Sequence, residues 1–385
     1  MKTNVKNFLA VFTALAFIAA VFSGCVKAND GDNKGPVPAA SDLAVIHETE
    51  FGGIYADITI DDFNSLGFDF GDSVNVIFSN GYSAEDLPYY NGYYVKTGET
   101  LVIGYPGYPH IKVCINSGND LWDIAKADEN TTVTISLNEK AKYLDIQQAR
   151  DLHYEDEREK YASDEVFANF RAVKVSTIKD NLVFRSASPC DNQHNRATYV
   201  NSLISQYGVG YIINLADNDE KIRGYIADEN FSFNYFLSLY NGGNVIPLAM
   251  NMNFGSAEFK QKAAAGLTAM LENDGPYLIH CTEGKDRTGF MCMLLEALCN
   301  ASYNEIVNDY MITYDNYYGI TKEKDAKRYS LIVELVLNPM IEGMAGEEVD
   351  DFENADLAAF AVQYLKDGGM TAAQISALKD KIVKV

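Results

Sequence analysis

The sequence predicts an α/β protein in which a mainly parallel sheet flanked by helices follows a small β-rich domain. Three observations lead to this prediction. After residue 169, short apolar strands alternate with helices, which is typical of parallel sheets with helices on their faces. Between residues 43 and 140, β-branched runs are separated by turn signals rich in Gly, Pro and Asn. The chain has 385 residues, which suggests two or three domains at roughly 150 residues each.

The composition is that of a packed globular protein with a strongly acidic surface. Apolar residues make up 47% and charged residues 22% of the chain, which argues against bulk disorder and against a multi-span membrane protein. The 31 Lys and Arg and the 54 Asp and Glu residues give a formal charge of −23. Such a chain is poorly suited to bind nucleic acid or an anionic membrane through its whole surface. An anionic ligand therefore needs a local cluster of donors.

An apolar leader precedes the folded part of the chain. Lys2 and Lys6 give a basic start, and residues 8–22 form an uncharged run of 15 residues, short for a membrane span but suited to a signal peptide. The run ends in Phe-Ser-Gly followed by Cys25, which resembles a bacterial lipobox with Phe in place of the usual Leu. We therefore predict a lipoprotein signal peptide over residues 1–24 and a lipid on Cys25. Ordinary secretion with cleavage nearby is the alternative.

Residues 25–42 are rich in Gly, Pro, Asn and Asp, and they predict a flexible tether between the lipid and the first folded domain. The protein is then extracytoplasmic, anchored to the bacterial cell envelope through its N-terminal lipid only. Of the five cysteines besides Cys25, at least one stays unpaired in an oxidising compartment, because the number is odd, and that thiol is a candidate for chemistry. Cys292 and Cys299 are seven residues apart in an apolar run, which favours packing.

The first domain, 43–140, is predicted to be a small antiparallel sandwich or barrel. Its predicted strands are the runs 55–60, 73–78, 99–105, 110–115 and 131–137. A tyrosine-rich segment over 89–94 suggests aromatic cover for loops and strand edges, with a sticky binding surface as the alternative. The charged segment 141–168 is predicted to be a solvated connecting helix rather than an interaction tail.

The second domain, 169–385, is predicted to contain the parallel sheet. Its predicted strands are 182–185, 211–215 and 277–280, and its predicted helices include 197–207, 256–273 and 288–300. Catalytic sites in such sheets lie at the carboxyl ends of the strands. The loop that follows the strand 277–280 is therefore the first place to look for chemistry.

That loop holds Cys281 and Arg287, separated by five residues and placed between a buried strand and a helix. Its backbone amides can converge on an anion, and the following helix presents its positive N-terminus to the same point. Arg287 can clamp two phosphoryl oxygens, and Gly284 allows the tight curvature. The same field favours the thiolate of Cys281, a nucleophile for phosphoryl transfer.

Other residues of the loop are expected to contribute to substrate binding. His280 and the Thr288 hydroxyl are expected to hold the loop and the sulfur by hydrogen bonds. Lys285 adds positive charge for a second phosphate, the alternative being a solvent-facing Lys that pairs with Glu283. Arg185 is expected to line the mouth of the site. The predicted substrate-binding residues are Thr282, Glu283, Gly284, Lys285, Thr288, His280 and Arg185.

The pattern His-Cys-x-x-Gly-Lys-Asp-Arg-Thr-Gly over 280–289 resembles the P-loop signature of the cysteine-dependent protein tyrosine phosphatase superfamily. The Gly-Lys-Asp-Arg-Thr-Gly form is similar to that of secreted bacterial phosphatases that accept both phosphotyrosine and phosphoinositides. Their opening element, Asn-Phe-Arg-Asp-hydrophobic-Gly, is matched in part over 169–174, with Ala172 for Asp and Lys174 for Gly. A strand-end Arg of that family is replaced by Ala216. The resemblance covers about 170 to 385 and implies a phosphatase-like fold there.

The leaving oxygen needs a proton from a positioned acid. Residues 236–256, where many superfamily members place an Asp, contain neither Asp nor Glu. The resemblance implies that the loop residue Asp286 acts instead. Asp217 and Asp219, which follow the strand 211–215, are the alternative candidates for this acid. The alternative role for Asp286 is a structural one, in which it orients Arg287.

The resulting hypothesis is a phosphatase that hydrolyses phosphomonoesters through a phosphocysteine, with Cys281, Arg287 and Asp286 as catalytic residues. A phosphotyrosine protein is the first substrate class, and a phosphoinositide or an inositol phosphate is the alternative. A hypothesis of another class is a catalytically weak surface protein that binds phosphoanions. No metal or cofactor is expected, because the sequence has no His-Glu-x-x-His or Cys-x-x-Cys ligand pattern.

Overall fold

The computed structural model describes residues 37–96 and 98–384. The predicted signal peptide, the lipid on Cys25 and most of the tether lie outside the described residues. No helix within the described ranges is long and apolar enough to cross a membrane.

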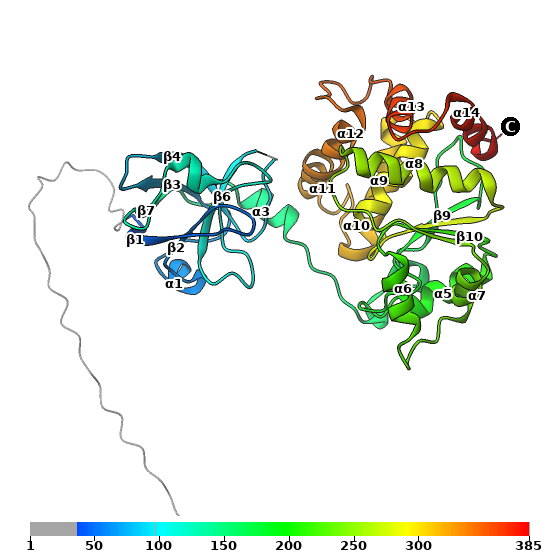
Figure 1. Ribbon diagram of the computed structural model, residues 1–385, viewed down its shortest axis with the longest axis horizontal. Helices are drawn as coiled ribbons and strands as arrows, with labels where there is room; N and C mark the ends of the chain where they lie inside the picture. Colours follow the sequence, from blue (N-terminus) through cyan, green and yellow to red (C-terminus); the bar gives the residue numbers. More distant parts are fainter. Residues whose placement is uncertain (1–36, 97, 385) are drawn as a thin grey trace, which may run out of the picture. The chain divides into compact units, whose positions relative to one another are not determined.

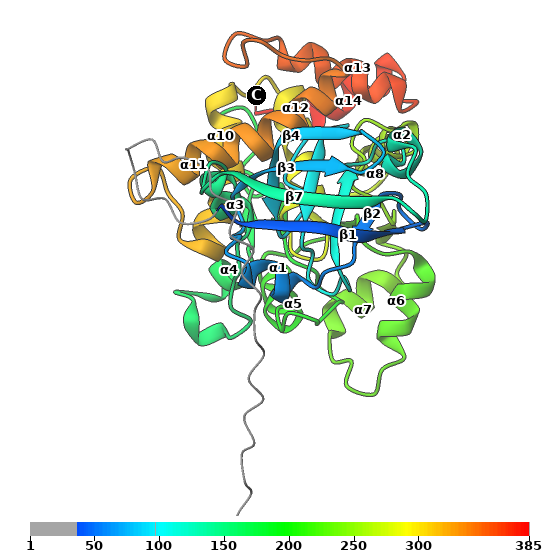
Figure 2. The same ribbon diagram turned by 90° about the vertical axis from the view of Figure 1, so that its left-hand side faces the viewer.

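The β-rich domain is a closed barrel of seven strands in the order β1-β2-β6-β5-β4-β3-β7. Figure 2 shows β4, β3, β7 and β1 side by side. Neighbouring strands are antiparallel except for the parallel pair of β4 and β5. The strands are β1 (Ala39–His47), β2 (Ile54–Ala56), β3 (Ser73–Phe78), β4 (Ser83–Tyr90), β5 (Thr100–Ile103), β6 (Ile111–Ile115) and β7 (Thr132–Glu139), and two short helices are α1 (Ile60–Ser65) and α2 (Leu121–Ala125).

Alternation along the strands builds the core of the barrel. On β3, Val74, Val76 and Phe78 are buried, whereas Ile77 is 54% exposed on the opposite face. Two side chains of the tyrosine-rich segment, Tyr89 and Tyr90 at the end of β4, are also buried. The aromatic run therefore contributes to the core of this domain.

Three features of this half differ from the sequence prediction. The predicted strand 55–60 ends early, because the Thr59 side chain accepts a hydrogen bond from the amide of Asp62 and so caps α1. Strand β1 begins at Ala39, inside the predicted tether, and pairs with β7 and β2. Strand β4 was not predicted; its sequence includes Pro88 and acidic residues that are unusual in strands.

The segment between the two domains is not the single helix predicted for 141–168. It contains α3 (Leu144–Arg150), a 3₁₀ turn η1 (Arg158–Lys160) and α4 (Asp164–Phe167), separated by irregular chain. The buried guanidinium of Arg196 donates to the Glu155 carbonyl at 3.0 Å and to the Asp156 carboxylate at 2.6 Å. These bonds occupy groups in the irregular stretch, so Arg196 favours an extended path over a helix there.

The C-terminal domain contains a five-stranded sheet in the order β11-β10-β12-β9-β8. The pairs among β11, β10, β12 and β9 are parallel, and β8 is antiparallel to β9. The strands are β8 (Arg171–Ala172), β9 (Val183–Ser186), β10 (Tyr211–Asn214), β11 (Val245–Pro247) and β12 (Tyr277–His280). The mixed α/β class that the sequence predicts is thus confirmed here.

Helices cover both faces of this sheet, with α5, α6 and α7 on one side and α8 and α9 on the other (Figure 1). On β12, Tyr277 and Ile279 pack in the core with α8 and α9, whereas Leu278 packs with α5 and α7. The helices are α5 (Ala197–Gln206), α6 (Asp219–Ile226), α7 (Asn234–Asn241), α8 (Ala257–Glu272), α9 (Asp286–Leu298), α10 (Tyr303–Tyr318), α11 (Ala326–Ile332), the π-helix η2 (Val333–Leu337), α12 (Asn338–Ala345), α13 (Leu357–Asp367) and α14 (Ala372–Ile382).

The central position of β12 and α9 determines where the site lies. Strand β12 lies between β10 and β9, and α9 is apolar on nearly every side, with each residue from Thr288 to Leu298 buried. The loop that joins them leaves the carboxyl end of the central strand. It is therefore held by neighbours on several sides.

Candidate active site

The loop 281–287 connects β12 to α9 in a tight turn. Cys281 directly follows the strand and is 3% exposed, and α9 begins at Asp286. Gly284 has φ +70°, and a Cβ at this position would lie 2.3 Å from the carbonyl oxygen of Ser186 at the end of β9. Only glycine fits this backbone conformation and this close approach without displacing the chain.

The carbonyl groups of the loop are bound from its outer side. The amide of Ser188 donates to the Thr282 carbonyl at 3.0 Å. The Tyr317 hydroxyl, at the end of α10, donates to the Glu283 carbonyl at 2.6 Å. These donors come from separate segments of the chain, so the loop is held by tertiary contacts rather than by its own turns.

The Gly284 carbonyl has two donors of its own. Asn169 Nδ2 and Arg185 Nη2 each lie 3.1 Å from it. In a planar trans peptide the N–H points opposite to the C=O. The amides of Glu283, Gly284 and Lys285, which follow the three bound carbonyls, therefore point to the inner side of the loop.

Those inward amides have no protein acceptor. Within the described residues, no backbone amide from 282 to 288 donates a hydrogen bond to another group. The N-terminal end of α9 faces the same region and carries partial positive charge. A row of free amides at a helix N-terminus is suited to bind an anion, and Cys281 is the first residue of the same loop.

Arg287 is held at the edge of this cradle. Its Nη1 donates to the Met250 carbonyl at 3.1 Å, and its Nη2 is 3.4 Å from the Thr282 hydroxyl. A guanidinium has five N–H donors in a planar fork. Two bonds position Arg287 and leave other donors for an anion held by the loop amides.

A buried charge network supports the loop from behind. Asp309 on α10 is 3% exposed and accepts hydrogen bonds from Arg185 Nη1 at 2.8 Å and Arg171 Nε at 3.4 Å. Burial alone would raise the pKa of Asp309, but the two guanidiniums outweigh it and lower that pKa. The Arg171 Nη1 also donates to the Asn169 side chain at 2.7 Å, which links this network to the Gly284 carbonyl.

Glu296 on α9 is a second carboxyl of this network. It is 1% exposed, and burial together with the charge of Asp309 raises its pKa well above its ordinary value. Burial therefore favours the protonated form of Glu296, and its Oε1 has no hydrogen-bond partner among the described residues.

The prediction that Arg185 lines the mouth of the site is wrong. Its side chain is 1% exposed and lies between Asp309 and the Gly284 carbonyl. Arg185 is a positioning residue for the loop. No local pattern predicts this role, because Asp309, which binds Arg185, lies 124 residues further along the chain on α10.

Lys285 lies among acidic and aromatic groups rather than in open solvent. Its Nζ is 3.5 Å from Glu283 Oε2, 3.9 Å from Asp286 Oδ2 and 6.0 Å from the centre of the Tyr318 ring. Burial alone would lower the pKa of Lys285, but the neighbouring acids raise it well above its ordinary value. The pairing with Glu283 that the sequence left open is present, and it partly neutralises the ammonium.

The three candidate acids differ in their surroundings. Asp286 is 33% exposed, and its only ion-pair partner among the described residues is Lys285 at 3.9 Å. Asp217 is fully buried and bound to Lys221 Nζ at 2.9 Å and Asn214 Nδ2 at 3.1 Å. Asp219 contacts Arg223 and Tyr240. Of the three carboxylates, Asp286 is therefore the one least bound by other side chains of the described residues.

Of the two residues expected to hold the loop and the sulfur, His280 contacts the backbone of the loop, whereas Thr288 shows no such contact in the described residues. His280 is fully buried, with Nδ1 3.1 Å from the Cys281 carbonyl, and burial lowers its pKa to about 4, so the ring is neutral near pH 7. The Thr288 hydroxyl is buried and has no hydrogen-bond partner within the described residues. The sequence-based role of Thr288 as a hydrogen-bond donor to the sulfur is thus not seen in this structure.

An aromatic cluster on the outer side of the loop includes a residue of the inter-domain segment. Tyr154 stacks on Tyr317 with ring centres 4.9 Å apart, and burial followed by the charge of Glu283 raises the pKa of Tyr154. The guanidinium of Arg196 lies 4.7 Å from the Tyr154 ring and 5.0 Å from the Tyr317 ring. None of these three residues was predicted, because no local motif marks them.

The cysteines and possible metal ligands complete the inventory of reactive groups. Cys114, Cys190, Cys281, Cys292 and Cys299 are all free and buried. Burial raises the pKa of Cys292 to about 12 and that of Cys299 to about 11, which fits the packing role expected for both. The described part of the chain contains no cluster of three His, Cys, Asp or Glu side chains suited to a metal ion.

Comparisons with known proteins give one family. A family model described as "Tyrosine phosphatase family" matches residues 166–384, more than half of the chain. No curated protein matches the sequence. A solved structure that matches is the crystal structure of an uncharacterized conserved protein from Thermotoga maritima, with 24% identity over 25% of this chain and 35% of that chain, and a TM-score of 0.21.

Proposed function

The chain belongs to the tyrosine phosphatase family, and from this premise we propose that it hydrolyses phosphomonoesters through a phosphocysteine intermediate on Cys281. The observation that carries the proposal is the row of unpartnered amides from 282 to 288 in the loop that begins with Cys281. Because the loop carbonyls are already bound from outside, the amides need no rearrangement to receive a phosphoryl group.

The proposed reaction has two steps. In the first, the Cys281 thiolate attacks phosphorus and the bond to the leaving oxygen breaks, while Arg287 and the loop amides bind the equatorial oxygens. Asp286 gives its proton to the leaving alcohol or phenol. In the second, water attacks the phosphocysteine, the Asp286 carboxylate accepts a proton from that water, and inorganic phosphate and the free thiolate result.

Phosphotyrosine is the substrate class that the surroundings of the loop favour. Lys285 is already paired with Glu283 and lies near Asp286, so its charge is less available to a second phosphate. A phosphoinositide or an inositol phosphate remains the second candidate, because Lys285 retains its positive charge.

The predicted lipid on Cys25 gives this proposal a location. We propose that the enzyme acts on extracytoplasmic substrates at the bacterial cell envelope, with the lipid as its membrane anchor. A shift of the protein from the membrane fraction to the soluble fraction in a Cys25→Ser variant tests this anchor. Unchanged membrane association of that variant contradicts it.

The chemistry is tested by phosphate release with EDTA present, comparing the wild type with Cys281→Ser. We expect the wild type to hydrolyse p-nitrophenyl phosphate and Cys281→Ser to lose activity, because a serine hydroxyl is a much weaker nucleophile at neutral pH. Cys114→Ser, in the barrel, is the matched control and retains activity. Equal phosphate release by the wild type and Cys281→Ser excludes the thiolate mechanism. A wild type that binds vanadate but releases no phosphate supports the phosphoanion-binding alternative.

The substrate class is tested by comparing a phosphotyrosine peptide with a phosphoinositide. We expect a higher wild-type kcat/KM toward the peptide, and similar losses with both substrates in Lys285→Ala, because Lys285 is already paired with Glu283. A larger loss toward the phosphoinositide supports the alternative substrate class, in which Lys285 binds a second phosphate.

A further inference from the structure

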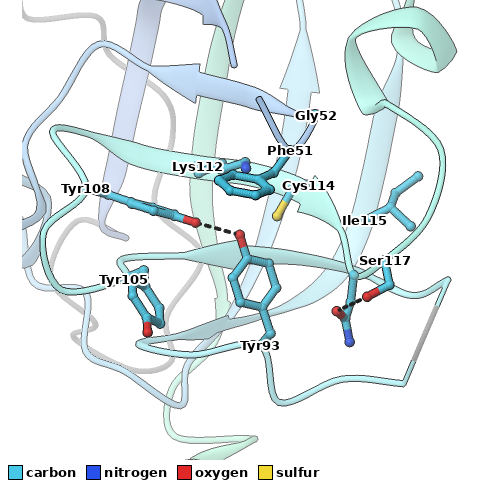
Figure 3. Close-up of a pocket in the computed structure, with 10 residues that line it drawn as sticks. Phe51, Gly52, Tyr93, Tyr105, Tyr108, Lys112, Cys114, Ile115 and Ser117 are labelled. Atoms are coloured by element: carbon cyan, nitrogen blue, oxygen red, sulfur yellow. Dashed lines mark hydrogen bonds between the residues drawn. The ribbon is translucent and has the colours of Figure 1, made fainter. Parts of the chain in front are cut away.

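The barrel domain contains a pocket that phosphatase chemistry does not use. Its volume is about 530 Å³, within the range usual for small-molecule sites. Its lining includes Phe51, Tyr93, Tyr105, Tyr108 and Lys112. Strand β6 gives one wall, and the loops after β1, β4 and β5 give the others. Figure 3 shows the Tyr93 and Tyr108 hydroxyls pointing toward one another across this hollow.

The loop that carries Phe51 is fixed by a buried ion pair. Lys112 is 1% exposed, and its Nζ lies 2.5 Å from Glu48 Oε2. The same Glu48 carboxylate accepts hydrogen bonds from the amides of Glu50 at 2.7 Å and Phe51 at 3.1 Å. Burial alone would raise the pKa of Glu48, but Lys112 and the two amides outweigh it and lower that pKa. The carboxylate is therefore ionised and clamps the loop.

A second carboxylate holds the other side of the loop. Asp120 accepts a hydrogen bond from the Gly53 amide at 2.7 Å and contacts His47 Nε2 at 2.7 Å. The loop thus has little freedom, yet it presents the Phe51 ring 74% exposed to solvent. An exposed aromatic ring adds nothing to the stability of the barrel. Because the loop is already fixed, however, a ligand could bind to the ring without the entropy cost of ordering the loop.

The charges of the pocket select the class of ligand. Among the described residues that line it, Lys112 alone is charged, and its charge is balanced by Glu48. An additional cation is disfavoured, because the Lys112 ammonium already lies 5.6 Å from the centre of the Tyr108 ring. An anion gains little from an ammonium that is already paired, and the net charge of −23 repels it. The ligand is therefore neutral.

The polar groups of the lining indicate hydroxyl groups on that ligand. Tyr93 and Tyr108 share one hydrogen bond of 2.8 Å, which uses one of their two hydroxyl protons and leaves the other free to donate. Asn116 and Ser117 also line the pocket; Ser117 donates to Asn116 Oδ1 at 3.2 Å and Asn116 Nδ2 donates to the Val95 carbonyl at 2.7 Å, which leaves the Ser117 oxygen as an acceptor. Phe51 and Tyr105, 74% and 43% exposed, offer flat apolar faces beside these groups.

We infer that this pocket binds a neutral saccharide. A pyranose ring has an apolar C–H face that stacks on an aromatic ring and hydroxyl groups at its edge that bond to Tyr, Ser and Asn. The tyrosine-rich segment of the sequence thus has two uses: Tyr89 packs in the barrel core, whereas Tyr90 is buried in a second cluster against which the pocket residue Tyr93 packs. The site lies in a different domain from the loop 281–287, so the inference does not rest on the phosphatase activity.

The test is calorimetric binding of neutral oligosaccharides to the purified protein. The probes are oligosaccharides of glucose, galactose, mannose and N-acetylglucosamine, with glucuronic acid oligomers and choline as the charged comparisons. We expect at least one neutral probe to bind and the charged probes not to bind. Phe51→Ala and Tyr105→Ala are expected to weaken binding about tenfold, since each removes one stacking face. Tyr105→Phe keeps that face and the affinity.

Control measurements distinguish a specific loss of saccharide binding from unfolding of the variant. Ile77→Ala removes an exposed side chain of the same barrel outside the pocket lining, and it retains full binding. All variants are expected to keep the unfolding midpoint of the barrel and the hydrolysis of p-nitrophenyl phosphate. Absence of millimolar binding to every neutral probe, preferential binding of a charged probe, or equal binding by wild type, Phe51→Ala and Tyr105→Ala overturns the inference.

Discussion

Arg185 donates a hydrogen bond from Nη2 to the carbonyl oxygen of Gly284 at 3.1 Å, while its Nη1 binds the carboxylate of Asp309. A charged side chain that is 1% exposed thus connects α10 to the backbone of the loop 281–287. The direction of the loop amides depends on this connection, because a carbonyl bound on the outside turns the next amide inward. The shape of the site is therefore set largely by residues that do not touch the substrate.

Removal of the Asp309 charge tests this support. In Asp309→Asn, the guanidiniums of Arg171 and Arg185 lose their buried counter-charge, so we expect the free energy of unfolding to fall by about 3–5 kcal/mol. Urea denaturation measures this change. Asp315→Asn on the same helix is the control; its ion pair with Lys324 is exposed and contributes at most about 1 kcal/mol. Similar losses in both variants would contradict the proposed role of Asp309.

The Gly284→Ala substitution tests the close approach to β9. A Cβ at this position meets the Ser186 carbonyl at 2.3 Å, so the loop must move, and a displacement of this size lowers kcat/KM by about 100-fold. Gly319→Ala is the matched control, because Gly319 also has positive φ, +64°, but open space around it. It is expected to lose about 1 kcal/mol of stability and to keep its activity. Steady-state kinetics with p-nitrophenyl phosphate compares the two.

The dependence of the hydrolysis rate on the leaving group tests which residue is the general acid. Asp286→Asn is expected to lose about 10²- to 10⁴-fold in rate with an alkyl phosphate, whose leaving oxygen needs a proton. The same variant loses much less with p-nitrophenyl phosphate, whose leaving group departs as a stable anion. Asp219→Asn is expected to leave this dependence unchanged. A uniform loss across both substrates in Asp286→Asn indicates that Asp286 only orients Arg287.

Glu296 gives a prediction with a defined pH dependence. Its pKa is raised by burial, so the folded protein keeps the proton above the pH at which the unfolded chain releases it. The contribution of Glu296 to stability is therefore fully present below pH 4.5 and is lost as the pH rises toward the folded-state pKa. Glu296→Gln keeps a neutral hydrogen-bonding group without this loss. We expect it to be as stable as the wild type at pH 5 and more stable at pH 8, by thermal unfolding. Lower stability of Glu296→Gln at pH 8 contradicts a neutral Glu296.

The sequence alone predicts those parts of the structure whose residues are adjacent in the chain. The residues from Cys281 to Arg287 form one short pattern between a strand and a helix, and β12 and α9 lie within two residues of the predicted bounds. The run 73–78 coincides with β3 because its alternation is regular. In these segments local patterning and tertiary structure agree, so each could be read without knowledge of its neighbours.

The support of the site could not be predicted, because it is assembled from distant segments. The donors to the loop carbonyls come from Asn169, Arg185, Ser188 and Tyr317, which share no spacing that a sequence reveals. Arg185 was placed at the mouth because a cation near a phosphate site suggests a ligand contact. Only its burial beside Asp309 distinguishes support from contact. The prediction of one helix over 141–168 is wrong for a similar reason, because the side chain of Arg196, which lies outside this segment, binds the carbonyl of Glu155.

The hydroxyl of Tyr317 and the carboxylate of Asp309, both on α10, have a kinetic consequence for the newly made chain. Because α10 follows Arg287 along the sequence, the catalytic loop cannot take its final shape until this later helix has docked. During refolding, recovery of turnover should consequently lag behind recovery of helical circular dichroism. A chain that ends before Tyr303 keeps Cys281 and Arg287 but lacks α10, and we expect it to show no phosphatase activity.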